Sequence, residues 1–116
     1  MKSGYNMKPT QHYLHHFKLK WSAYVDYYEL RVDKVVVSSC HLEQIAPKRY
    51  RLYAVYTCPD LRCRGYAYEM LFRILHSYHL HGATVNLTST PVAVKLYLKL
   101  GFVRISTQWL EYQIKL

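Results

Sequence analysis

The sequence is short of the residues that mark secreted, membrane-spanning or repetitive chains. Its three cysteines are an odd number and form no paired framework, which argues against a small disulfide-bonded secreted domain. No run approaches the roughly 20 consecutive apolar residues that a membrane-spanning helix needs. Residues 1–7 lack the apolar core of a signal peptide. Glycine and proline, at four residues each, are too scarce for a fibrous or low-complexity chain. We therefore expect a cytoplasmic protein with reduced thiols and no membrane contact.

Acidic side chains are also scarce. Asp and Glu total seven against 16 Lys and Arg, which gives a formal net charge of +9. This balance favours a polyanionic partner, such as a nucleic acid, an acidic protein surface or a cofactor that carries several phosphates. The 13 tyrosines would suit stacking on bases, although tyrosine is also an ordinary strand residue. A small basic nucleic-acid-binding protein therefore stays open as an interpretation.

No metal site is predicted. Cys58 and Cys63 lie close together in the sequence, but structural zinc sites need a second close pair of ligands, and none follows. Neighbouring histidines such as His15 and His16 point to opposite faces of a strand, so they do not share one ion easily.

The residues that are present predict a single α/β domain over residues 1–116. Hydrophobic residues make up 51% of the chain and charged residues 20%, as in ordinary globular domains. Alternating β-branched and aromatic residues in the first half predict strands, with a turn at Asp33-Lys34 and a loop at residues 43–48. We expect an antiparallel meander of four strands, at residues 12–21, 22–32, 35–40 and 50–57.

A strand-to-helix turn follows the fourth of these strands, within residues 57–67. Gly65 has no Cβ, so the backbone there can curl closely around a ligand, and Arg62 and Arg64 flank it. Free backbone N–H groups at the start of a helix attract phosphate, aided by the helix dipole. The residues alone therefore predict an anion-binding turn at the edge of a sheet.

A helix is predicted from this turn to about Leu80, because apolar residues recur at helical spacing from Ala67 through Tyr78. Gly82 suits the left-handed position after its end. Residues 83–88 then alternate and predict a strand parallel to residues 50–57, joined to it by a right-handed crossover.

A second helix is predicted after this strand. Thr90 would cap it, Pro91 would take its first position, and Gly101 would end it. The last two predicted strands are residues 102–107 and 109–116.

Two segments carry a resemblance to a known family. Arg62-x-x-Gly65-x-Ala67 resembles the Q/R-x-x-G-x-G/A signature that wraps the pyrophosphate of acetyl-CoA in GNAT acetyltransferases. Residues 93–102 resemble the A-x-x-L-Y-x-K-x-G-F segment of the same family, and the two segments occur in the family's order. The resemblance implies a mixed, mostly antiparallel sheet with two helices and a parallel strand pair at the cofactor cleft. It also implies a compact member, because residues 12–32 leave no room for the family's first two helices.

The resemblance implies acetyl-CoA as co-substrate, with its pantetheine arm between the two parallel strands. Tyr97 matches the tyrosine that commonly donates a proton to the departing thiolate. Thr90 stands where many relatives have an asparagine, so one expected CoA contact differs. The cofactor-binding residues predicted in this way are Tyr56, Thr57, Cys58, Arg62, Cys63, Arg64, Gly65, Tyr66, Ala67, Tyr68 and Thr90.

The general base is left open. Arg51 occupies the position at which some family members have a glutamate. Glu43, His41, or a water molecule held by Tyr53 or Thr88 can replace it.

The function implied by the resemblance is N-acetyl transfer from acetyl-CoA to an amine. The missing helices leave an open acceptor face, which favours a protein lysine or N-terminus as acceptor. Direct attack within a ternary complex is expected, because the motifs couple no cysteine to a histidine; Cys58 nevertheless keeps an acetyl-cysteine intermediate open. Two alternatives remain: a non-catalytic module of the same fold that binds CoA or a partner, which the missing glutamate favours, and the basic nucleic-acid-binding protein.

Overall fold

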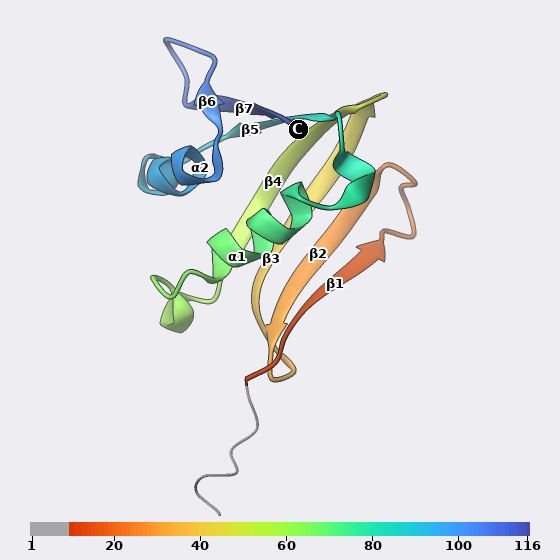
Figure 1. Ribbon diagram of the computed structural model, residues 1–116, viewed down its shortest axis with the longest axis vertical. Helices are drawn as coiled ribbons and strands as arrows, with labels where there is room; N and C mark the ends of the chain where they lie inside the picture. The colour runs from red at the N-terminus through yellow and green to blue at the C-terminus, as the bar shows by residue number, and fades with distance from the viewer. Residues whose placement is uncertain (1–9) are drawn as a thin grey trace, which may run out of the picture.

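The computed structural model describes residues 10–116, so residues 1–7, expected to lack a signal-peptide core, lie outside the described part. One seven-stranded sheet, in the order β1-β2-β3-β4-β5-β7-β6, carries two helices (Figure 1). No helix within residues 10–116 is long and apolar enough to cross a bilayer. The strands are β1 (His12–Lys18), β2 (Val25–Val32), β3 (Val35–Ala46), β4 (Arg49–Thr57), β5 (Thr84–Thr88), β6 (Val103–Arg104) and β7 (Glu111–Lys115), and the helices are α1 (Tyr66–Leu75) and α2 (Val94–Leu100).

Strands β1 to β4 form the predicted antiparallel meander. β1 passes to β2 through residues 19–24 without a helix, as expected for a compact member. The turn at Asp33-Lys34 is confirmed, and both residues adopt positive φ, which suits a tight hairpin. The loop expected at residues 43–48 is wrong. β3 continues to Ala46 and turns at residues 47–48, because its polar side chains lie on the solvent face of a strand that is still paired.

α1 crosses one face of the meander (Figure 1). The core lies between them and continues to buried residues of β5, α2 and β7. Alternation puts every second strand residue on this face, and the aliphatic face of α1 covers them. Exposed aromatic side chains on the opposite, outer face of β1 include Tyr13 and Phe17. The central buried residues are Leu30, Leu42 and Leu52 from the sheet, and Met70, Leu71, Ile74 and Leu75 from α1.

The first helix ends at Leu75 and not at Leu80 as predicted. Two side chains after this residue donate hydrogen bonds to carbonyl groups of the last helical turn, in competition with backbone N–H groups. Ser77 Oγ donates to Ile74 O at 2.6 Å, and His76 Nδ1 donates to Phe72 O at 2.8 Å. A short 3-10 turn follows, and Tyr78, predicted on the apolar face, is 94% exposed. Spacing alone does not report such side-chain competition.

The edge strands are also shorter than predicted, because turns take up their ends. Ser106 Oγ accepts hydrogen bonds from the backbone N–H groups of Gln108 and Trp109, so a turn separates β6 from β7.

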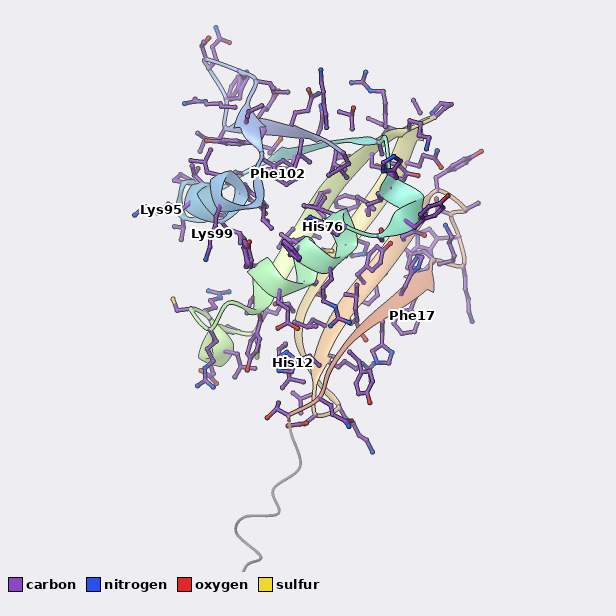
Figure 2. All side chains as sticks on the ribbon, in the orientation of Figure 1. His12, Phe17, His76, Lys95, Lys99 and Phe102 are labelled. Carbon is purple, nitrogen blue, oxygen red and sulfur yellow. The ribbon has the colours of Figure 1, made fainter. Side chains whose placement is uncertain are left out.

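At the other edge of the sheet, a side-chain contact holds α1 against β1. His12 Nδ1 of β1 (labelled in Figure 2) lies 2.8 Å from Glu69 Oε1 of α1.

We expect Leu30→Ala to lower the free energy of unfolding by about 2–5 kcal/mol, because Leu30 is fully buried and the change leaves a cavity. Leu98→Ala makes the same change on α2 at a side chain that is 51% exposed, and should cost less than about 0.5 kcal/mol. Urea denaturation of both variants measures the difference. Equal losses would contradict this placement of the core.

Candidate active site

The site begins where β4 and β5 separate. The two strands are parallel, as predicted, but they pair only from Arg49↔Thr84 to Arg51↔Asn86. Beyond Arg51 the edge of β4 that faces β5 carries backbone N–H and C=O groups without ladder partners. The residues near the end of β4 therefore border an open gap inside the sheet.

A β-bulge in β4 accompanies this separation. His41 of β3 pairs with Tyr53 and Ser39 pairs with Tyr56, so one β3 residue faces both Ala54 and Val55. Ala54 has φ of +53°, a left-handed conformation that is uncommon for a residue with a side chain. A bulge bends its strand and increases the local twist. The bend is therefore placed at the point where β4 leaves β5.

A cleft of about 840 Å³ occupies the gap and extends to the turn before α1 and to the start of α2. Its walls contain residues far apart in sequence, which the fold brings together. Nine of the eleven predicted cofactor residues line it, and so does Tyr97. The nine are Tyr56, Thr57, Arg62, Cys63, Gly65, Tyr66, Ala67, Tyr68 and Thr90.

The two remaining predicted residues, Cys58 and Arg64, do not line the cleft. The backbone N–H of Cys58 donates to Val37 O at 3.0 Å, so Cys58 is still held against β3. Arg64 is exposed in the turn. Their assignment to the cofactor remains a prediction from the motif.

The turn before α1 has the geometry of an anion site. Gly65 is the N-cap of α1 with φ of +80°, and a Cβ added there would meet no atom within 4 Å. The N–H groups of the first helical turn, Tyr66 to Tyr68, have no partner inside the helix. Arg62 Nε donates to Thr57 O at 3.1 Å, which fastens the turn to the end of β4. The space beside Gly65 is therefore open, and the backbone N–H groups that follow it are available to bind an anion.

Tyr97 lies in α2 and is only 5% exposed. Its ring meets that of Phe102, which follows α2, edge-on with 5.7 Å between centroids. Burial, with a smaller contribution from Cys40, raises the pKa of Tyr97 to about 12. The phenol therefore keeps its proton at neutral pH and can donate it to a base that forms in the cleft.

Thr90 does not cap α2 as predicted. A 3-10 turn, Pro91–Ala93, comes first, and the Thr90 side chain makes no capping hydrogen bond. The start of α2 is delayed to Val94, because the Thr90 carbonyl already accepts from Ala93 N at 3.1 Å.

The candidates for a general base fall into two groups. Glu43 is engaged by Arg51 at 2.8 Å, and His41 lies between the rings of Tyr27 and Tyr53 on the outer face; neither lines the cleft. Tyr53 and Thr88 do line it. No Asp, Glu or His of residues 10–116 lines the cleft.

Sequence reasoning missed part of the wall. Its apolar members, among them Leu52, Val55 and Leu96, look like ordinary core residues in the sequence, and no local signal separates them. Lys99 was also missed: its ammonium lies 4.6 Å from the ring centroid of Tyr68 at the cleft, and it projects outward from α2 (Figure 2). Its spacing after Tyr97 in the second motif was the available signal.

Comparison with known proteins identifies the family. The model of the acetyltransferase (GNAT) domain matches residues 11–116. The chain therefore belongs to the GNAT acetyltransferase family, as its two motifs indicated. No curated protein sequence matches this chain.

Solved structures agree on the fold. The PaiA N-acetyltransferase from Thermoplasma acidophilum, in complex with coenzyme A, is 16% identical with a TM-score of 0.67, over 80% of this chain and 62% of that one. An acetyltransferase from Thermus thermophilus is 15% identical with a TM-score of 0.70, over 82% and 66%. The Escherichia coli ribosomal-protein-S18-alanine N-acetyltransferase is 18% identical with a TM-score of 0.64, over 80% and 67%. At these identities the likeness establishes the fold alone, and the predicted mixed sheet is confirmed.

We expect the pKa of Tyr97 to lie near 12, against the ordinary tyrosine value of 10.0, because burial disfavours the phenolate. Subtracting the ultraviolet pH titration of Tyr97→Phe from that of the wild type isolates this group. A raised pKa stabilises the fold below the unfolded value, so the wild type should lose stability relative to the variant as the pH rises from 10 towards 12. A difference centred at pH 10 would contradict the burial of this phenol.

Proposed function

We propose that the protein is an N-acetyltransferase that moves an acetyl group from acetyl-CoA to a protein amine, either a lysine or an N-terminus. The observation that carries the proposal is the cleft between β4 and β5, which ends at the open turn of Gly65. The gap would hold an extended chain with amide groups, and the turn would hold a pyrophosphate. Acetyl-CoA has both parts in this order.

The cleft supports acetyl-CoA as co-substrate through complementary groups. The unpaired edge of β4 beyond Arg51 offers backbone donors and acceptors to the amides of pantetheine. The N–H groups at the start of α1 would bind the pyrophosphate, and Arg62 and Lys99 add positive charge near the mouth. The Thermoplasma relative was crystallised with coenzyme A, which supports this assignment by analogy.

The transfer proceeds by direct attack. The amine first loses a proton to water, and its nitrogen then forms a bond to the thioester carbonyl carbon. When the carbon–sulfur bond breaks, the electron pair leaves with sulfur, and Tyr97 protonates the thiolate. The second amine proton returns to the Tyr97 phenolate through water. At neutral pH the Tyr97 phenol, whose pKa is raised by burial, carries the proton that the thiolate takes up.

The open outer face of the meander supports a protein acceptor. The chain passes from β1 to β2 through residues 19–24 without a helix, and α1 and α2 both pack against the core on the inner face. No α-helix of residues 10–116 is therefore left to cover the outer approach to the gap. An acceptor segment can therefore approach along the sheet. Acetylation of a polyamine or aminoglycoside but of no protein would contradict this choice.

A non-catalytic module that binds CoA is the second candidate. The observation that favours it is the lack of any Asp, Glu or His among the described residues that line the cleft. Incubation with acetyl-CoA and candidate acceptors, followed by mass spectrometry, separates the two: a gain of one acetyl group on an acceptor requires the enzyme.

Gly65→Glu should abolish acetyl-CoA binding in calorimetric titration, because it places a carboxylate in the space assigned to the pyrophosphate. Gly82→Glu is the matched control. Gly82 has φ of +79°, nearly that of Gly65, and precedes β5 at the end opposite to the cleft, so this variant carries the same charge and strain. It should bind as the wild type does. Circular dichroism confirms that both fold; equal binding by all three proteins would contradict the site.

Tyr97→Phe should reduce kcat about 100-fold or more, because it removes the proton donor, while the Kd of acetyl-CoA stays within about twofold. Tyr112→Phe removes a hydroxyl from another buried tyrosine that does not line the cleft, and should leave kcat unchanged. Thiol release, followed with a chromogenic reagent, measures both. An unchanged kcat in Tyr97→Phe would remove it from the mechanism.

A further inference from the structure

A second, smaller hollow of about 80 Å³ lies beside the cleft. Arg51, Asn86, Leu87, Thr88, Ile105 and Glu111 line it. Thr88, the last residue of β5, lines both the hollow and the main cleft. The two spaces therefore meet at the end of β5, next to the gap assigned to the pantetheine arm.

The hollow opens on the outer face of the sheet. Val85 and Leu87 are buried in the core, so the alternate residues Asn86 and Thr88 point to the opposite side. Glu111 is paired directly with Thr88 across β5 and β7 and shares this side. The hollow is thus reached from the face that the meander leaves uncovered.

Glu111 is the acidic member of this surface. Its carboxylate has no Lys, Arg or His nitrogen within 4.0 Å among residues 10–116. The cation in the same hollow, Arg51, is held by Glu43 at 2.8 Å. Of the residues lining the cleft or the hollow, Arg51, Arg62 and Glu111 are charged, so Glu111 supplies the negative charge there. A carboxylate without a cation, next to a reactive space, is suited to a cationic ligand.

We propose that this hollow receives the acceptor amine and that Glu111 binds it as an ammonium ion, which makes Glu111 the acceptor-binding residue. This inference rests on the proposed acetyl transfer. Lysine, with a reference pKa of about 10.4, and other alkyl amines are cationic at neutral pH. A protein with net charge +9 repels such ions, and a local carboxylate offsets the repulsion at the point of entry. The Glu111 carboxylate would therefore favour cationic alkyl amines over neutral aryl amines as acceptors.

Nuclear magnetic resonance tests the position without a known acceptor. The protein is saturated with CoA and titrated with n-butylammonium chloride. We expect the amide signals of Thr88, Ile105 and Glu111 to shift in the wild type. In Glu111→Gln the shifts should require at least about tenfold more ligand, because a charge-assisted contact is lost. Glu29→Gln removes the same charge from the outer face away from the hollow, where Glu29 pairs with Arg31, and should behave as the wild type.

Kinetics test the selectivity. With a lysine peptide as acceptor, Glu111→Gln should raise KM about tenfold or more and leave the Kd of acetyl-CoA unchanged. With aniline, whose nitrogen is uncharged at neutral pH, wild type and variant should react alike. If acetyl-CoA binds, two results would overturn the inference: n-butylammonium shifts amide signals elsewhere on the protein, or it binds the wild type and Glu111→Gln with equal affinity. Failure of the wild type to bind acetyl-CoA would instead overturn the proposed function.

Discussion

β4 and β5 share a parallel ladder over only three residue pairs and then part, at the place where β4 carries the bulge at Ala54. Two parallel strands that stayed paired would leave no room for a ligand inside the sheet. Their separation exposes one edge of β4 and opens the cleft that Gly65 and Tyr97 line. The cleft, the anion turn and the buried phenol all depend on this one departure from regular pairing.

Charge is divided between the two sides of this opening. On the cleft side, Arg62, Lys99 and the free N–H groups of α1 favour an anion. On the outer side, Arg51 is neutralised by Glu43, and Glu111 faces the hollow and forms no ion pair within residues 10–116. An anionic cofactor and a cationic acceptor would thus approach from opposite faces and meet at Thr88, which lines both spaces. This arrangement is consistent with transfer inside a ternary complex.

The direct passage from β1 to β2 leaves the outer face as a surface of side chains. The rings of Phe17, Tyr27, His41 and Tyr53 follow one another across four strands, with 5.1 to 6.1 Å between neighbouring centroids. Arg51 lies over the last ring at 4.9 Å and also borders the hollow. Packing between these rings thus stabilises the outer face of the sheet, and the row of rings ends beside the hollow assigned to the acceptor.

The sequence by itself determined the local features: the strand-to-helix turn at Gly65, the apolar face of α1, the end of α2 at Gly101, the hairpin at Asp33-Lys34 and the motif that contains Tyr97. Each depends on residues within one or two turns of chain, whose propensities and spacing are readable. The nine predicted residues that line the cleft were instead implied by the family resemblance that two short motifs carry.

Only the tertiary structure decided the rest. The bulge at Ala54 is a mismatch in length between two paired strands, and alanine carries no signal for it. The end of α1 was decided by competing side chains. Glu111 reaches the site because β7 pairs with β5 in one register, which puts it opposite Thr88. A shift by one residue would turn it to the core face. Such contacts depend on which distant segments pair, and local propensity does not encode that choice.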